Sequence, residues 1–135
     1  MVARSTVAEE SAHALLLDAA LENIPYAFCV WSADFRLVMW NRHYIELYSF
    51  PADQIRRGMT LDEIVRLSAE MGNHPDQTPD DFLDSYRREL LANRNGLRCK
   101  SREMLFQGRI IETAHVYSEG LGWVITHEDV TEELA

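Results

Sequence analysis

The chain has 135 residues, of which 47% are hydrophobic and 26% charged, and its 22 Asp and Glu against 13 Lys and Arg give a formal net charge of −9. This length predicts a single domain with its own core, and the composition excludes disordered, collagen-like and low-complexity proteins. No run of about 18 apolar residues occurs, so no membrane span is expected. The acidic balance, with Arg residues interspersed among Asp and Glu, argues against nucleic-acid binding.

The two cysteines, Cys29 and Cys99, form no CxxC pair and have no His at metal-ligand spacing, so we expect no metal site. The N-terminus carries Glu9 and Glu10 before its Leu-rich stretch, which is not typical of a secretory signal. A cytoplasmic protein with free thiols is therefore expected, and a single disulfide is the alternative.

Residues 6–23 predict an N-terminal helix, because Ala, Leu and Glu dominate and no Gly or Pro interrupts them before Pro25. Its apolar residues lie three and four apart, which places them on one helical stripe. That stripe either covers the chain's own sheet or pairs with the same helix of a second subunit. It comprises Ala14, Leu17, Leu21 and Ile24.

Two strands are predicted next, at 26–31 and 37–40, with turn residues at 32–35 that join them into a hairpin. Asn41 is placed to cap a short helix over residues 42–48.

Two longer helices follow. Thr60 and Glu63 fit a capping box for a helix that runs to about Met71. Thr78 and Pro79 are typical of a second helix start, with an end near Asn93.

The last third of the chain changes to the alternating period of strands, at 99–106, 109–117 and 123–130. A two-residue turn at 107–108 and a longer one at 118–122 predict an antiparallel meander. The residues alone therefore indicate an α+β domain with a helical insert.

This order of elements resembles a PAS sensor domain, an α+β fold whose five-stranded antiparallel sheet carries a helical insert between strands 2 and 3. Here an N-terminal helix is added. Several motifs carry the resemblance. They are Ile24-Pro25 before the first strand, the run from Asp34 to Trp40-Asn41-Arg42, then Gly58, Leu61 and Gly72, and the ending His127-Glu128-Asp129-Val130-Thr131-Glu132, which is similar to the family's Asp-x-Thr signature. The set is most similar to a subgroup found upstream of bacterial sensor histidine kinases and diguanylate cyclases.

The resemblance implies a flanking and dimerisation helix at 1–24, a PAS domain at 25–131 and the start of a truncated output helix at 132–135. It implies a non-enzymatic sensory and dimerisation module of a bacterial signal-transduction protein, which binds a small ligand or a partner. The signal would pass through Asp129, Val130 and Thr131 to a kinase or cyclase output, attached or in trans. A homodimer is expected, with Leu17, Leu21 and Ile24 in the helix that mediates it.

Strand parity divides the sheet residues into two largely apolar faces. In flavin-binding relatives the residue two before the Asp of the exit signature faces the cavity; here that residue is His127, and the resemblance assigns its face to the helices. The other face would meet the N-terminal helix or a partner subunit. The residues expected to line a ligand cavity are Cys29, Trp31, Met39, Tyr44, Thr113, His115, Trp123, Ile125 and His127. The alternative is an interior that these bulky residues simply fill.

The cofactor stays unknown. Residues 58–61 hold no thiol, so the flavin–cysteinyl photochemistry of one PAS branch is not expected. A haem would need an axial His such as His43 or His74, and a lone His of this kind is more often solvated. A pair of half-buried His, His115 and His127, is compatible with pH sensing.

Two rival functions are retained. One is a small α+β isomerase-like enzyme with His115 or His127 as base and Asp34 or Glu112 nearby. The early hairpin argues against it, because such folds usually begin with long helices. The other rival is a pure protein–protein interaction module with a filled core.

Overall fold

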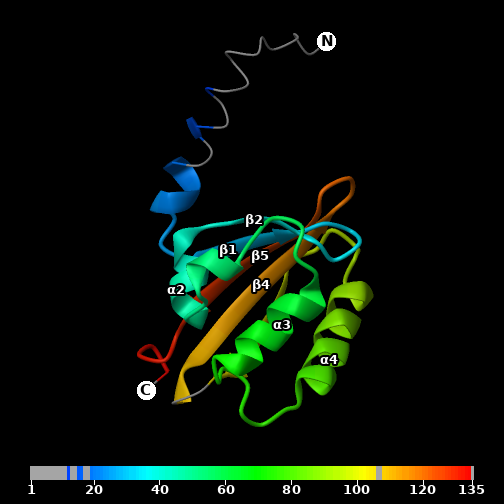
Figure 1. The fold of residues 1–135 in the computed structure, drawn as a ribbon. Helices are drawn as coiled ribbons and strands as arrows, with labels where there is room; N and C mark the ends of the chain where they lie inside the picture. Colours follow the sequence, from blue (N-terminus) through cyan, green and yellow to red (C-terminus); the bar gives the residue numbers. More distant parts are fainter. Residues whose placement is uncertain (1–11, 13–14, 17–18, 106–107, 135) are drawn as a thin grey trace.

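The computed structural model describes residues 12, 15–16, 19–105 and 108–134. Five strands form one antiparallel sheet in the order β2-β1-β5-β4-β3, and helices α2, α3 and α4 contribute buried side chains to the core on one face of it (Figure 1). The expected α+β fold with a helical insert between the second and third strands is confirmed. In chain order the elements are β1 Ala27–Trp31, β2 Leu37–Trp40, α2 Arg42–Tyr48, the 3₁₀ helix η1 Ala52–Gln54, α3 Leu61–Glu70, α4 Pro79–Ala92, β3 Cys99–Met104, β4 Ile110–Ser118 and β5 Gly122–Asp129.

The three predicted helix starts are confirmed by their caps. The Asn41 side chain accepts the Tyr44 N–H at 3.2 Å, and the Thr78 hydroxyl likewise accepts the N–H of Asp81 at 3.1 Å. Thr60 and Glu63 form the complete reciprocal capping box. These caps satisfy backbone donors that the first helical turn leaves without partners, so each helix begins at a fixed residue.

The last three strands form the predicted antiparallel meander, and β5 at the centre of the sheet also pairs with β1. Each strand lies within two residues of its predicted bounds. The turn expected at 107–108 falls partly outside the described residues. The η1 turn after Pro51 was not predicted.

A bulge in the first hairpin overturns one face assignment. Trp31 lies opposite Leu37, but Val30 lies opposite Met39, so Val38 is the extra residue of β2. Met39 therefore shares a face with Val30, away from the helices, whereas strict alternation placed it with Cys29. Trp40, expected on the outer face, lies opposite Cys29 instead and packs against the core.

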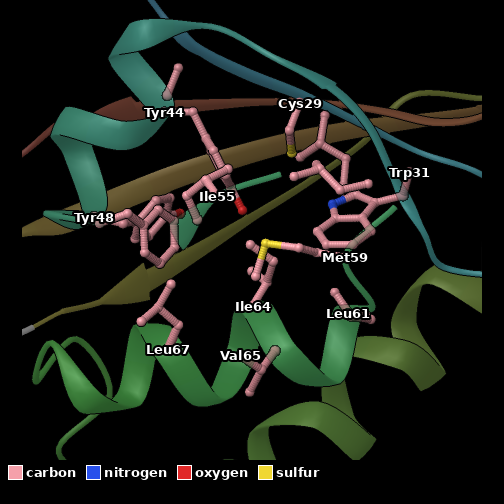
Figure 2. Packing of buried hydrophobic residues seen from close by; sticks show 14 of the residues in the cluster. Cys29, Trp31, Tyr44, Tyr48, Ile55, Met59, Leu61, Ile64, Val65 and Leu67 are labelled. Carbon is pink, nitrogen blue, oxygen red and sulfur yellow. The ribbon is translucent and has the colours of Figure 1, made fainter. Parts of the chain in front are cut away.

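The core lies between the sheet and the helices. Figure 2 shows Cys29 and Trp31 on the sheet side facing Leu61 and Ile64 of α3. Both sheet residues are at most 1% exposed. Strand β5 adds Ile125 opposite Cys29, so this face of the sheet is apolar along its central strands.

The N-terminal helix is described in part. Residues 19–23 are helical, and Leu21 is buried while Ile24 is half-buried. The fully buried Asn41 amide donates to the Leu21 carbonyl at 3.0 Å, and its oxygen accepts the Phe28 N–H. Asn41 thus ties this helix to β1 and α2.

Ala14 and Leu17 lie outside the described residues. No helix in the described part of the chain is both long and apolar enough to cross a bilayer.

Candidate ligand cavity

A cavity of about 200 Å³ lies between the helices and the β3–β4 side of the sheet. Gln77, Ser85 and Arg102 are exposed residues of its lining, so its mouth lies between α4 and β3. Its lining comprises Trp31, Tyr44, Tyr48, Phe50, Leu61, Ile64, Val65, Ser68, His74, Gln77, Phe82, Ser85, Tyr86, Glu89, Ser101, Arg102, Glu103, Thr113 and His127.

Four of the nine residues expected to line a cavity do so: Trp31, Tyr44, Thr113 and His127. The other five do not. Cys29, Trp123 and Ile125 are fully buried in the core, Met39 lies on the opposite face, and His115 is buried without contributing to the lining.

His127 lines the cavity from β5, and each of its ring nitrogens contacts a neighbouring side chain. Its Nδ1 lies 2.6 Å from the Tyr48 hydroxyl, and its Nε2 lies 3.5 Å from Cys29 Sγ. Burial lowers the pKa of His127 to about 3 and raises the pKa of the Cys29 thiol to about 12. At neutral pH the ring and the thiol are therefore both uncharged.

A second polar group at the cavity was not predicted from the sequence. His74 donates from Nδ1 to Glu103 Oε1 at 2.9 Å, and its Nε2 lies 2.8 Å from the Ser68 hydroxyl. Its side chain is 5% exposed and stacks on Phe82 at 4.0 Å. The expectation of a solvated loop His was wrong, and both nitrogens are already occupied, so neither is free to ligate haem iron.

The residues near His74 and Glu103 in the sequence give little indication that the two side chains meet. His74 lies in a loop and Glu103 on an edge strand 29 residues later, and no spacing rule joins them. The only signal was an acidic residue at the inward parity of β3, since Glu103 lies opposite the fully buried Ile111.

The structure does not assemble the acid–base pairs of the isomerase-like alternative. His115 Nε2 has no hydrogen-bond partner among the described residues. Glu112 pairs with Lys100 and Arg102 through its carboxylate, and Asp34 is hydrogen-bonded to the Ser32 hydroxyl. Neither carboxylate contacts a His in the described part of the chain. That part also holds no group of three or more His, Cys, Asp or Glu placed to bind a metal ion.

The predicted exit residues form a compact turn at the end of β5. The Thr131 hydroxyl accepts the Ile110 N–H at 2.8 Å and donates to Asp129, whose carboxylate also accepts the Thr131 N–H. These bonds from Thr131 lower the pKa of Asp129 below its usual value. Beyond them, Leu134 donates its N–H to the Val130 carbonyl at 3.2 Å, which closes one helical turn.

Comparisons with known proteins agree with this architecture. A family model described as the PAS fold matches residues 21–135. The PAS domain of an HTR-like protein from Haloarcula marismortui superposes with a TM-score of 0.62 at 15% identity, over 89% of this chain and 93% of that one. The PAS domain of BvgS from Bordetella pertussis gives 0.63 at 15% identity, over 91% of each chain.

The structure of a phage VqmA–DPO complex gives a TM-score of 0.61 at 15% identity. There the match covers 96% of this chain but only 58% of that one. A search of curated protein sequences found no match. At these identities the solved structures establish the fold, and the family model establishes membership. The chain therefore belongs to the PAS-fold family, whose domains are typically sensory and signalling modules and generally not enzymes.

Proposed function

We propose that this chain is the sensory and dimerisation module of a cytoplasmic bacterial signalling protein, with no catalytic activity of its own. It binds a small ligand in the cavity and passes the signal through Asp129, Val130 and Thr131 to a histidine kinase or diguanylate cyclase output, in the same protein or in trans.

The observation that carries this proposal is the position of His127. It lines the cavity, and it lies on β5 two residues before Asp129. A ligand that competes for the Tyr48 hydroxyl or moves the ring therefore acts on the strand that ends at the exit turn. A difference of a few kcal/mol between two arrangements is enough to shift such an equilibrium.

The dimer part of the proposal rests on the apolar surface away from the cavity. Val116 and Val124 lie opposite each other on the outer face of the sheet and are only half-buried. Leu15 and Leu16 of the N-terminal segment are 71% and 68% exposed. We propose that a second copy covers this surface together with the N-terminal segment that includes Leu17, Leu21 and Ile24.

The cavity also supports ligand binding over the filled-core alternative, since a pure interaction module needs no such space. Its size is below the roughly 300–1,000 Å³ of pockets for drug-sized molecules, so the ligand is small.

Native mass spectrometry tests the proposal with a matched pair of variants. Ser101 lines the cavity and bonds to the Thr113 hydroxyl at 2.8 Å, so Ser101→Phe fills the space while Ser101→Ala removes only the hydrogen bond. We expect wild type and Ser101→Ala, isolated freshly or soaked in a bacterial metabolite extract, to carry a small-molecule mass. Ser101→Phe should not carry it, and all three should be dimers. A wild type that takes up no mass, or a phenylalanine variant that keeps it, contradicts the ligand site. A monomeric wild type contradicts the dimer.

A further inference from the structure

The cavity wall carries two carboxylates and one guanidinium, that of Arg102. Glu89 of α4 and Glu103 of β3 both line it, and no Lys does. The remaining described wall is mainly aromatic and aliphatic, with uncharged hydroxyl and amide groups between. The wall therefore combines negative charge with aromatic rings.

Glu103 is only partly satisfied. Its Oε1 accepts the Nδ1–H of His74 at 2.9 Å, and its side chain is 32% exposed. Its Oε2 accepts no hydrogen bond from any described residue. His74 fixes the carboxylate in position, because Ser68 holds the other side of the ring at 2.8 Å. One carboxylate oxygen thus remains available, on a group that cannot easily turn away.

Glu89 has no ion pair and no side-chain hydrogen bond with the described residues. Its neighbour in the cavity is Tyr86, one helical turn earlier on α4. Burial chiefly raises the pKa of Tyr86 well above its usual value, and the negative charges of Glu89 and Glu103 raise it further. The phenol consequently stays neutral beside two carboxylates.

The one Arg of the lining does not compensate for them. Its guanidinium, on Arg102, pairs with Glu112 at 3.1 Å, and these two residues lie opposite each other on the outer face of the sheet. Arg102 therefore satisfies a carboxylate outside the cavity.

We propose that the cavity binds a small organic cation, a protonated amine carried on an aromatic body, with the ammonium between Glu89 and Glu103 and the body against Tyr48, Phe82 and Tyr86. This inference rests on the proposed ligand-sensing function and names its ligand class.

The chemistry of the wall favours this class over the alternatives. An ammonium has three N–H donors and no acceptor, which suits carboxylate oxygens that lack partners. Aromatic faces attract cations, with a stronger effect where water is excluded. An anionic ligand would meet two like charges in a partly enclosed site, where they repel it.

Three probes of nearly equal shape test the ligand class: phenylethylamine, 2-phenylethanol and phenylacetate, which carry a positive, zero and negative charge at pH 7.5. Affinities are measured by isothermal titration calorimetry at two salt concentrations. We expect phenylethylamine to bind at least about tenfold more tightly than 2-phenylethanol. Phenylacetate should bind most weakly. The preference for the amine should shrink in high salt.

Two variants test whether Glu89 and Glu103 are the carboxylates that attract the ammonium. Glu89→Gln and Glu103→Gln should each reduce the amine preference several-fold and leave 2-phenylethanol unchanged. Glu119→Gln removes the same charge from the exposed turn between β4 and β5, outside the cavity, and should leave the amine preference intact.

The outcomes separate this inference from the proposed function. If 2-phenylethanol or phenylacetate binds as tightly as the amine, the proposal of a cationic ligand is wrong, whereas the proposal of a ligand site in the cavity is unaffected. If Glu119→Gln reduces the amine preference as much as the cavity variants do, the effect comes from the net charge of the protein and the site assignment is wrong. If no probe binds at millimolar concentration, the cation proposal is overturned, while the mass-spectrometric test with Ser101→Phe still decides the ligand site independently.

Discussion

The helix-covered face of the sheet has two ends that are built differently. At one end the fully buried Trp123 stacks on Phe35 at 4.8 Å, and its indole N–H donates to the Leu90 carbonyl at 3.2 Å. At the other end Tyr48, His74 and His127 surround open space. The same strand, β5, supplies Trp123 and His127, so the sheet does not decide which end is filled.

The two ends differ in the residues that the helices and their loops place against the sheet. The carbonyl at the C-terminal end of α4 and the ring of Phe35 close over Trp123, which leaves no room beside it. At the open end the loop after α3 inserts His74, whose polar contacts hold it against Ser68 and Glu103 at the wall. Close packing fixes the fold at one end, whereas at the other end the contacts of His74 hold polar side chains at the wall of a cavity.

The largest effect is expected at the filled end. Gly122 begins β5 at φ +112°, and a Cβ there would lie 2.0 Å from the Trp31 carbonyl oxygen. Gly122→Ala must displace backbone and should cost about 4 kcal/mol in the free energy of unfolding, measured by urea denaturation. Gly120, at φ +83°, offers open space, since a Cβ added there would meet nothing within 4 Å. Gly120→Ala should therefore cost only about 1 kcal/mol. Equal losses would show that close approach is not the cause.

A second comparison sets one aromatic residue from each end side by side. Trp123→Phe removes volume from a filled site and the hydrogen bond to Leu90, and should lower the free energy of unfolding by about 3 kcal/mol. Tyr86→Phe removes a cavity-lining hydroxyl that bonds to no described residue, and should change it by less than about 0.5 kcal/mol. The contrast between the two ends fails if the tyrosine variant is as unstable as the tryptophan variant.

At the open end, His127 should make the free energy of unfolding depend on pH. The pKa of His127 is about 3 in the folded protein against 6.5 as its ordinary value, so the unfolded chain binds a proton first as pH falls. The neutral ring therefore contributes stability that is fully present above pH 6.5 and is lost as pH falls towards 3. Between pH 8 and pH 5 the wild type should lose about 2 kcal/mol more than His127→Gln, because groups common to both proteins cancel. Parallel curves would show that His127 titrates normally.

Local chemistry predicted the elements well because their signals are short in range. Caps at Asn41, Thr60 and Thr78 act within three residues, and each begins the helix that it was expected to begin. Period-two alternation likewise placed the strands. It failed at β2, where the extra residue Val38 changes the parity without any Gly or Pro to mark it.

The cavity lining was predicted less completely, because it comes partly from the sheet and partly from the helices and loops that pack on it. Strand parity identified His127 and Thr113, which line it from the sheet. Tyr86, Glu89 and His74 line it from α4 and the loop after α3, and their orientation depends on how those segments dock. Trp123 was placed on the correct face of the sheet but was wrongly expected to line the cavity, because α4 covers it.

The order of helices and strands, the helix caps and the apolar character of both sheet faces follow from the amino-acid sequence, since these features depend on neighbouring residues and on fixed backbone periods. Which part of the interior is filled and which part is open follows instead from the way the helices pack on the sheet. That outcome depends on contacts between segments far apart in the chain, such as His74 with Glu103 and Trp123 with Leu90, whose geometry no local pattern encodes.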